Sequence, residues 1–176
     1  GLFKDLPQAV TVYRQLLADK ALRGYEDYVV LGSMMNPNYN IVSRSKIDSF
    51  ADLKGQKVRI VGPIIGQTVM AMGMVPVMMP PTKIVEAMGR GTVDAATLVP
   101  AAIVDFGVDR VAENNYLIPL GNGPLTLLMN RAKYEALPAD ARETLDRYGI
   151  DWVNDLYLKE LGSYNEELIA GFKADP

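Results

Sequence analysis

Arg59 is the side chain of this sequence best suited to holding a ligand. It stands near the end of the segment Lys57 to Val61, in which Val58, Ile60 and Val61 predict a buried strand. Ligands of an open α/β sheet bind just beyond the carboxyl ends of its strands, where a guanidinium offers a planar fork of donors to a carboxylate. From spacing alone, Arg59 could equally be a surface arginine paired with a nearby acid. The ligand-binding alternative predicts a protein that binds a small acid rather than an enzyme.

Gly62-Pro63 follows this strand and could contribute to the same site. Proline is tolerated in the first turn of a helix, so a helix is expected from Pro63 to Met72. Its free N–H groups and partial positive charge would then face the same anion as Arg59. Because Pro63 has no N–H, this contribution should be smaller than that of Arg59. The alternative is that Gly62-Pro63 is a plain turn.

The sequence lacks the residues on which most enzymes and metal sites depend. Its 176 residues include no cysteine and no histidine, which excludes thiol nucleophiles, the Ser-His-Asp triad and Cys- or His-ligated metals. An enzyme would have to use a cofactor or groups such as the carboxylates of Asp94 and Asp105 as acid and base. No carboxylate pair stands at an obvious spacing, so we predict no enzyme, no cofactor and no metal ligand.

Composition indicates a soluble globular protein of one domain or two small lobes. Apolar residues make up 49% of the chain, charged residues 22%, and the net charge is −3. The absence of a basic run argues against nucleic-acid binding, and no apolar run is long enough to span a bilayer. The chain opens at Gly1 without a methionine, which indicates processing or a segment boundary and leaves secretion open.

Hydrophobic periodicity predicts strands and helices in alternation. A capping-box pattern at Ser49 to Asp52 predicts a short helical turn before the strand that carries Arg59. A long helical stretch is expected after Pro138, with weak points at Gly149 and Gly162. This alternation indicates an α/β fold with a parallel or mixed sheet. The predicted strands are 28–32, 40–43, 57–61, 76–79, 93–99, 116–120 and 125–129, and the other predicted helices are 7–24, 63–72, 82–89 and 101–106.

Three landmarks stand in a fixed order along the chain. They are Asp52-Leu53-Lys54-Gly55-Gln56-Lys57-Val58-Arg59, Gly91-Thr92-Val93-Asp94-Ala95, and the run from Leu127 to Pro138, which reads LLMNRAKYEALP. In this order they resemble the periplasmic solute-binding proteins of tripartite ATP-independent periplasmic (TRAP) transporters, the DctP-like family. The resemblance extends from about Pro7 to beyond Trp152. It implies a receptor that captures a small organic acid for a membrane permease.

The resemblance also implies an architecture. It implies the two-lobe, type II periplasmic-binding-protein fold, with mixed sheets and a long C-terminal helix. The second lobe would comprise 39–124 with part of 160–176, and 1–38 with 125–160 would supply a partial first lobe and the hinge-spanning long helix. Family members are distinctly longer, so the first lobe is expected to be incomplete, and a homodimer is one way to replace the missing part.

Ligand contacts can be carried over position by position. Arg59 matches the arginine that holds the ligand carboxylate, and Tyr39 matches a polar position that is often a second arginine in relatives. Thr97, Leu98, Val99 and Pro100 match the ligand-facing segment, in which Leu98 replaces a frequent asparagine. These departures indicate a more apolar acid with one carboxylate. Asp94 and Trp152 are expected to be structural, the latter through packing. The main alternative is a ligand-sensing domain of the same fold in a signalling system.

Overall fold

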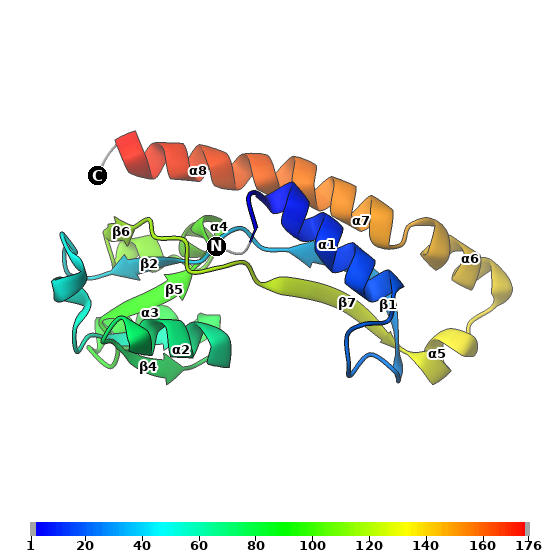
Figure 1. Ribbon diagram of the computed structural model, residues 1–176, viewed down its shortest axis with the longest axis horizontal. Coiled ribbons are helices and arrows are strands. Elements are labelled where there is room, and N and C mark those ends of the chain that lie inside the picture. Colours follow the sequence, from blue (N-terminus) through cyan, green and yellow to red (C-terminus); the bar gives the residue numbers. More distant parts are fainter. Residues whose placement is uncertain (1–2, 175–176) are drawn as a thin grey trace. The chain divides into compact units, whose positions relative to one another are not determined.

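The computed structural model describes residues 3–174, which form two compact units (Figure 1). Unit 1 contains residues up to Pro37 together with Asn122–Ser163, and unit 2 contains Asn38–Gly121 together with residues from Tyr164 onward. The chain therefore passes between the units three times, at 37–38, 121–122 and 163–164. In the described range, no helix combines the length and the apolar character needed to cross a membrane.

Unit 2 is built on a five-stranded mixed sheet in the order β4-β3-β5-β2-β6. Strand β3 pairs in parallel with β4 and β5, whereas β2 is antiparallel to β5 and β6. The carboxyl ends of β3, β4, β5 and β6 and the amino end of β2 therefore lie along one edge, called here the carboxyl edge. The strands are β2 (Asn40–Ser43), β3 (Lys57–Ile60), β4 (Val75–Met78), β5 (Ala95–Leu98) and β6 (Asn114–Tyr116).

Helices cover both faces of this sheet. On one face, Val58 and Ile60 of β3 pack with residues of α2 (Pro63–Ala71) and of η1 (Phe50–Leu53). On the other, Ala96 and Leu98 of β5 pack with α3 (Ile84–Gly89), α4 (Pro100–Asp105) and Phe172 of α8 (Ser163–Ala174). Short 3₁₀ turns, η2 (Pro81–Lys83) and η3 (Val108–Arg110), complete the connections. Because both faces are covered, β5 is buried at every position, including the polar Thr97.

Unit 1 combines an antiparallel strand pair with helices. Strands β1 (Tyr28–Met35) and β7 (Pro124–Asn130) pair along their length, with an irregularity between Val30 and Gly32. At Gly32 an added Cβ would lie 3.1 Å from Val153 of α7, so this close approach favours glycine. The helices are α1 (Leu6–Ala18), α5 (Arg131–Glu135), α6 (Ala139–Arg147) and α7 (Ile150–Tyr157), and a π-helical segment, η4 (Leu158–Gly162), leads into α8.

A buried tyrosine links α1 to the strands of unit 1. The Tyr13 hydroxyl hydrogen-bonds the hydroxyls of Thr126 on β7 and of Tyr25. Burial is the main cause that raises the pKa of Tyr13 to about 12, since it disfavours the phenolate.

Several elements differ from the sequence prediction for local reasons. The first helix ends at Ala18 rather than near Gly24, because Lys20 takes a left-handed backbone with φ 53°. The strand predicted at 116–120 is instead β6, because Ile118 N–H turns back to bond Tyr116 O. The helical stretch after Pro138 breaks at the predicted Gly149, so the long C-terminal helix begins at Ile150.

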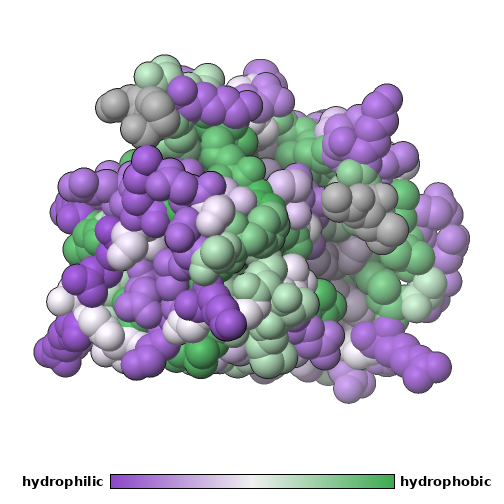
Figure 2. All heavy atoms as spheres, turned by 60° about the vertical axis from the view of Figure 1, so that its left-hand side comes forward, coloured by the Kyte–Doolittle hydropathy of each residue, from purple (hydrophilic) through white to green (hydrophobic). Residues whose placement is uncertain are grey.

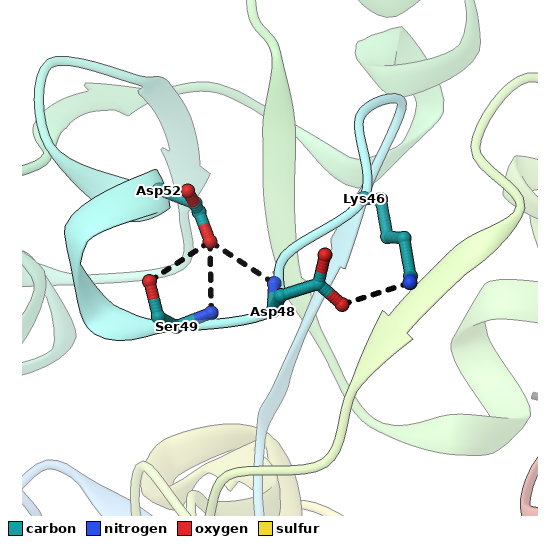
Figure 3. Close-up of polar contacts among 4 residues, drawn as sticks. All are labelled: Lys46, Asp48, Ser49 and Asp52. Atoms are coloured by element: carbon teal, nitrogen blue, oxygen red, sulfur yellow. Dashed lines mark hydrogen bonds and ion pairs between the residues drawn. The ribbon is translucent and has the colours of Figure 1, made fainter.

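The predicted capping box forms and opens η1, ahead of the Arg59 strand (Figure 3). One oxygen of the Asp52 carboxylate accepts hydrogen bonds from Ser49 N–H, Ser49 Oγ and Asp48 N–H, at 2.8, 3.0 and 3.1 Å. The bond from the Ser49 hydroxyl is the main cause that lowers the pKa of Asp52 from 3.8. Lys46 pairs with Asp48 at 2.9 Å on the same exposed loop.

We expect Asp52→Ala to lower the melting temperature at neutral pH but not in strong acid. A carboxyl group with a pKa lowered by folding stabilises the fold above its unfolded value, here 3.8, and loses that contribution as pH falls through the folded pKa. Thermal melts of both proteins from pH 7 to pH 2 test this. A difference that persists unchanged in strong acid would contradict the role of the ionised carboxylate.

Candidate functional site

Arg59 lies inside unit 2, close to the carboxyl edge. Its residue is 3% exposed. The guanidinium donates from Nε to Met79 O at 3.0 Å and from Nη1 to Thr97 O at 3.3 Å. Met79 follows β4 and Thr97 belongs to β5, so Arg59 bridges the two strands that flank its own. The alternative of a surface arginine is therefore wrong.

The electrostatic environment of Arg59 is unusual for a buried cation. Burial lowers its pKa, and the electrostatic interaction with Tyr39 partly offsets this effect. Among the described residues no carboxylate forms an ion pair with it. A buried charge is normally paired, and carbonyl dipoles compensate it less fully than an anion would. The guanidinium of Arg59 could therefore still bind a carboxylate.

The carboxyl edge around Arg59 carries no other charge. The chain segments that form it are 38–40, 60–64, 78–82, 98–101 and 116–121, and their side chains are all uncharged. Lys83, which directly follows the segment 78–82, pairs with Glu86. An anion that reached this edge would therefore find one cation.

Thr97 is buried, and its side chain hydrogen-bonds the neighbouring strand β3. Its Oγ1 donates to Arg59 O at 3.2 Å, while its own carbonyl accepts from the Arg59 guanidinium. The two residues are therefore bonded to each other twice across β3 and β5. This reciprocal pair fixes the strand from which the guanidinium extends.

Removing the Thr97 hydroxyl should weaken this pair measurably. Thr97→Val keeps the shape of the side chain but loses one buried hydrogen bond, which should lower the free energy of unfolding by about 1 kcal/mol. Thr68→Val is a matched control, because the Thr68 hydroxyl makes a similar but exposed bond to Ile64 O within α2. Urea denaturation measures the free energy of unfolding of the two variants. Equal losses would mean that the buried bond of Thr97 stabilises the protein no more than the exposed bond of Thr68.

Tyr39 and Val99 lie close to the edge, on the same face of the sheet. Both are 8% exposed and belong to the same apolar cluster as Ile60. The backbone of Tyr39 is paired with residues 120 and 121, through bonds to Gly121 O and from Leu120 N–H. These bonds hold Tyr39 just before β2. That Tyr39 and Val99 contact a ligand stays a prediction.

Leu98 packs into the core rather than toward open space. It is 3% exposed and contacts the cluster that contains Ile84, Met88 and Ile103. Pro100 is also buried and begins α4. The next N–H, that of Ala101, donates to the side-chain Oδ1 of Asn165 on α8 at 3.0 Å. Asn165 was missed by sequence reasoning, because nothing in its helical surroundings distinguishes it from a surface asparagine.

Gly62 caps the amino end of α2 in an extended conformation, with φ −174°. An added Cβ would meet nothing within 4 Å, so the position itself does not demand glycine. By contrast, a Cβ at Gly66 would lie 2.9 Å from Ile60 Cδ1, so the first turns of α2 approach the end of β3 closely. The start of α2 therefore lies at the carboxyl edge, as the sequence predicted.

Two cavities, of about 580 and 500 Å³, lie in unit 1, and neither is lined by a predicted site residue. Trp152, expected to pack, is 51% exposed and lines the first, with its ring 5.7 Å from that of Tyr148. Within residues 3–174 no group of three or more acidic side chains could hold a metal ion.

A family sequence model matches almost the whole chain. Residues 2–176 match the sequence model of "Bacterial extracellular solute-binding protein, family 7", known as DctP, so the chain belongs to this family. It is a family of solute-binding proteins rather than of enzymes, as predicted. The α/β fold with mixed sheet and C-terminal helix is also confirmed.

Solved structures resemble this chain in fold. An extracytoplasmic solute receptor of Bordetella pertussis that binds pyroglutamic acid is 21% identical, with a TM-score of 0.81 over 93% of this chain and 54% of its own. A TRAP periplasmic solute-binding protein from Sulfitobacter sp. with bound β-D-galacturonate is 21% identical, with a TM-score of 0.79 over 98% and 58%. One from Rhodoferax ferrireducens in complex with copurified benzoate is 25% identical, with a TM-score of 0.73 over 87% and 50%. The chain thus spans about half the length of these relatives.

Proposed function

We propose that this chain is part of an extracytoplasmic receptor that captures a small organic acid for a TRAP-type secondary transporter. The observation that carries the proposal is Arg59, a buried cation bonded to two carbonyls and to no described carboxylate. The family assignment and the acids bound by the three relatives support it. The receptor would release the acid to the permease subunits of the transporter, and in a Gram-negative cell it would work in the periplasm.

Binding, in this proposal, centres on the carboxyl edge of unit 2. The carboxylate would pair with Arg59, whose fork of donors suits two oxygens. Gly62 at the amino end of α2 would add the helix dipole, and Tyr39 and Val99 would contact the rest of the acid. Thr97 and Pro100 would support the site from within, and Leu98 would act through packing alone. A homodimer stays a prediction that the proposal does not need.

Titration calorimetry of the intact protein with a panel of organic acids tests the proposal. We expect at least one acid to bind with micromolar affinity or better, and the corresponding primary amide, which lacks the charge, to bind far more weakly. Equal affinity for acid and amide would contradict recognition of a carboxylate. Failure of every acid in a broad panel would contradict the function itself.

A further inference from the structure

The carboxyl edge also exposes apolar side chains that could contact the part of the acid beyond its carboxylate. Three large apolar side chains at this edge are strongly exposed: Val61 by 46%, Ile64 by 78% and Met78 by 65%. Apolar side chains reach the surface among hydrophilic ones in Figure 2. Single exposed apolar residues are ordinary, but these three stand within a few residues of the two strand ends nearest Arg59.

Strand register brings these three residues together. Met78 pairs with Ile60 across β4 and β3, and Val61 is the next residue after Ile60. Ile64 stands in the first turn of α2, whose close approach to Ile60 at Gly66 fixes that turn over the end of β3. The three residues therefore lie near the end of β3, which is one residue beyond Arg59.

The charge pattern of the edge limits the ligand as well. The segments that form it carry no charged side chain, and Arg59 directly precedes one of them. A second carboxylate would find no second cation in these segments. Desolvating a charge without a partner costs free energy, so such a ligand should bind more weakly. Hydroxyl groups of a ligand that lay against Val61, Ile64 and Met78 would likewise lose water without gaining partners from these three side chains.

We infer that the site selects monocarboxylic acids with an apolar body over dicarboxylic and polyhydroxylated acids. This inference rests on the proposed function and names the class of its ligand. Arg59 would supply the charge pairing, and the apolar edge residues would supply burial of the hydrocarbon part. Discrimination would arise mainly from groups that the edge leaves unpaired.

Calorimetry of the intact protein with phenylacetate, succinate and gluconate tests the inference. We expect phenylacetate to bind at least about tenfold more tightly than the other two, because the penalty of an unpaired buried group exceeds that factor. Tighter or equal binding of succinate or gluconate would overturn the inference and leave the proposed function intact. If no acid of any class binds, the proposed function fails, and the inference fails with it.

A pair of variants locates the selectivity at the edge. Ile64→Lys adds a cation beside the site on an exposed position, so it should raise the affinity for succinate by about three- to fivefold and weaken phenylacetate binding. Met70→Lys is the matched control, since Met70 is an exposed apolar residue at the other end of α2. Equal responses of the two variants would show that the apolar edge does not contact the ligand.

Discussion

Replacing Arg59 by methionine should abolish measurable acid binding while the protein stays folded. Truncating one partner of a buried, hydrogen-bonded charge pair costs about 2–5 kcal/mol, which corresponds to an affinity loss of about 30- to 5,000-fold. Methionine fills much of the same volume, so the sheet should tolerate it, although the bonds to Met79 O and Thr97 O are lost. Calorimetry measures the affinity, and far-ultraviolet circular dichroism checks the fold.

Two further variants separate charge from geometry. Arg59→Lys keeps the positive charge but loses the planar fork, so it should retain only part of the affinity, at least about tenfold below the parent protein. Arg44→Met removes an exposed arginine that follows β2 at the opposite edge of the sheet, and should change the affinity less than about twofold. If Arg44→Met weakens binding as much as Arg59→Met, the effect is one of net charge and not of the site.

Replacing Leu98 by asparagine should destabilise unit 2 strongly and leave the ligand ranking unchanged. Leu98 is almost fully buried among Ile84, Met88 and Ile103. The substitution removes apolar contacts and leaves a buried amide without partners, which together should lower the free energy of unfolding by about 3–5 kcal/mol. Chemical denaturation measures this loss.

A conservative change at the same position is the control for Leu98. Leu98→Met preserves volume and polarity, so it should cost less than about 1.5 kcal/mol. Both variants, where folded, should keep the order of affinities of the acid panel. A stable Leu98→Asn variant with a new preference for polar acids would show instead that Leu98 contacts the ligand.

The sequence predicted the fold class and most elements, because their signals are local. The strand at Lys57–Ile60, the capping box at Ser49 and the helix start at Pro63 are each predicted from neighbouring residues only. Errors arose where a turn competed with the hydrophobic pattern. The strand expected at 116–120 is broken by the turn from Tyr116 to Ile118 and by Pro119, which has no N–H to donate to a ladder.

The site could be predicted only as far as strand ends are visible in a sequence. The position of Arg59 near the end of β3 was predicted, but its partners Met79 and Thr97 come from flanking strands whose order is a tertiary property. The packing role of Leu98 was hidden, because a strand covered on both faces shows no alternation that would tell core from ligand side. The role of Asn165 could not be predicted either, because its partner, Ala101 N–H, is distant in the chain.

The central claim is that Arg59 holds the carboxylate of an organic acid. A crystal structure of the intact protein with phenylacetate bound tests it most directly. The account predicts a carboxylate oxygen within about 3 Å of a guanidinium nitrogen of Arg59, with the apolar body of the acid against Ile64. An acid bound elsewhere, while Arg59 keeps only the carbonyls of Met79 and Thr97 as partners, would contradict the claim.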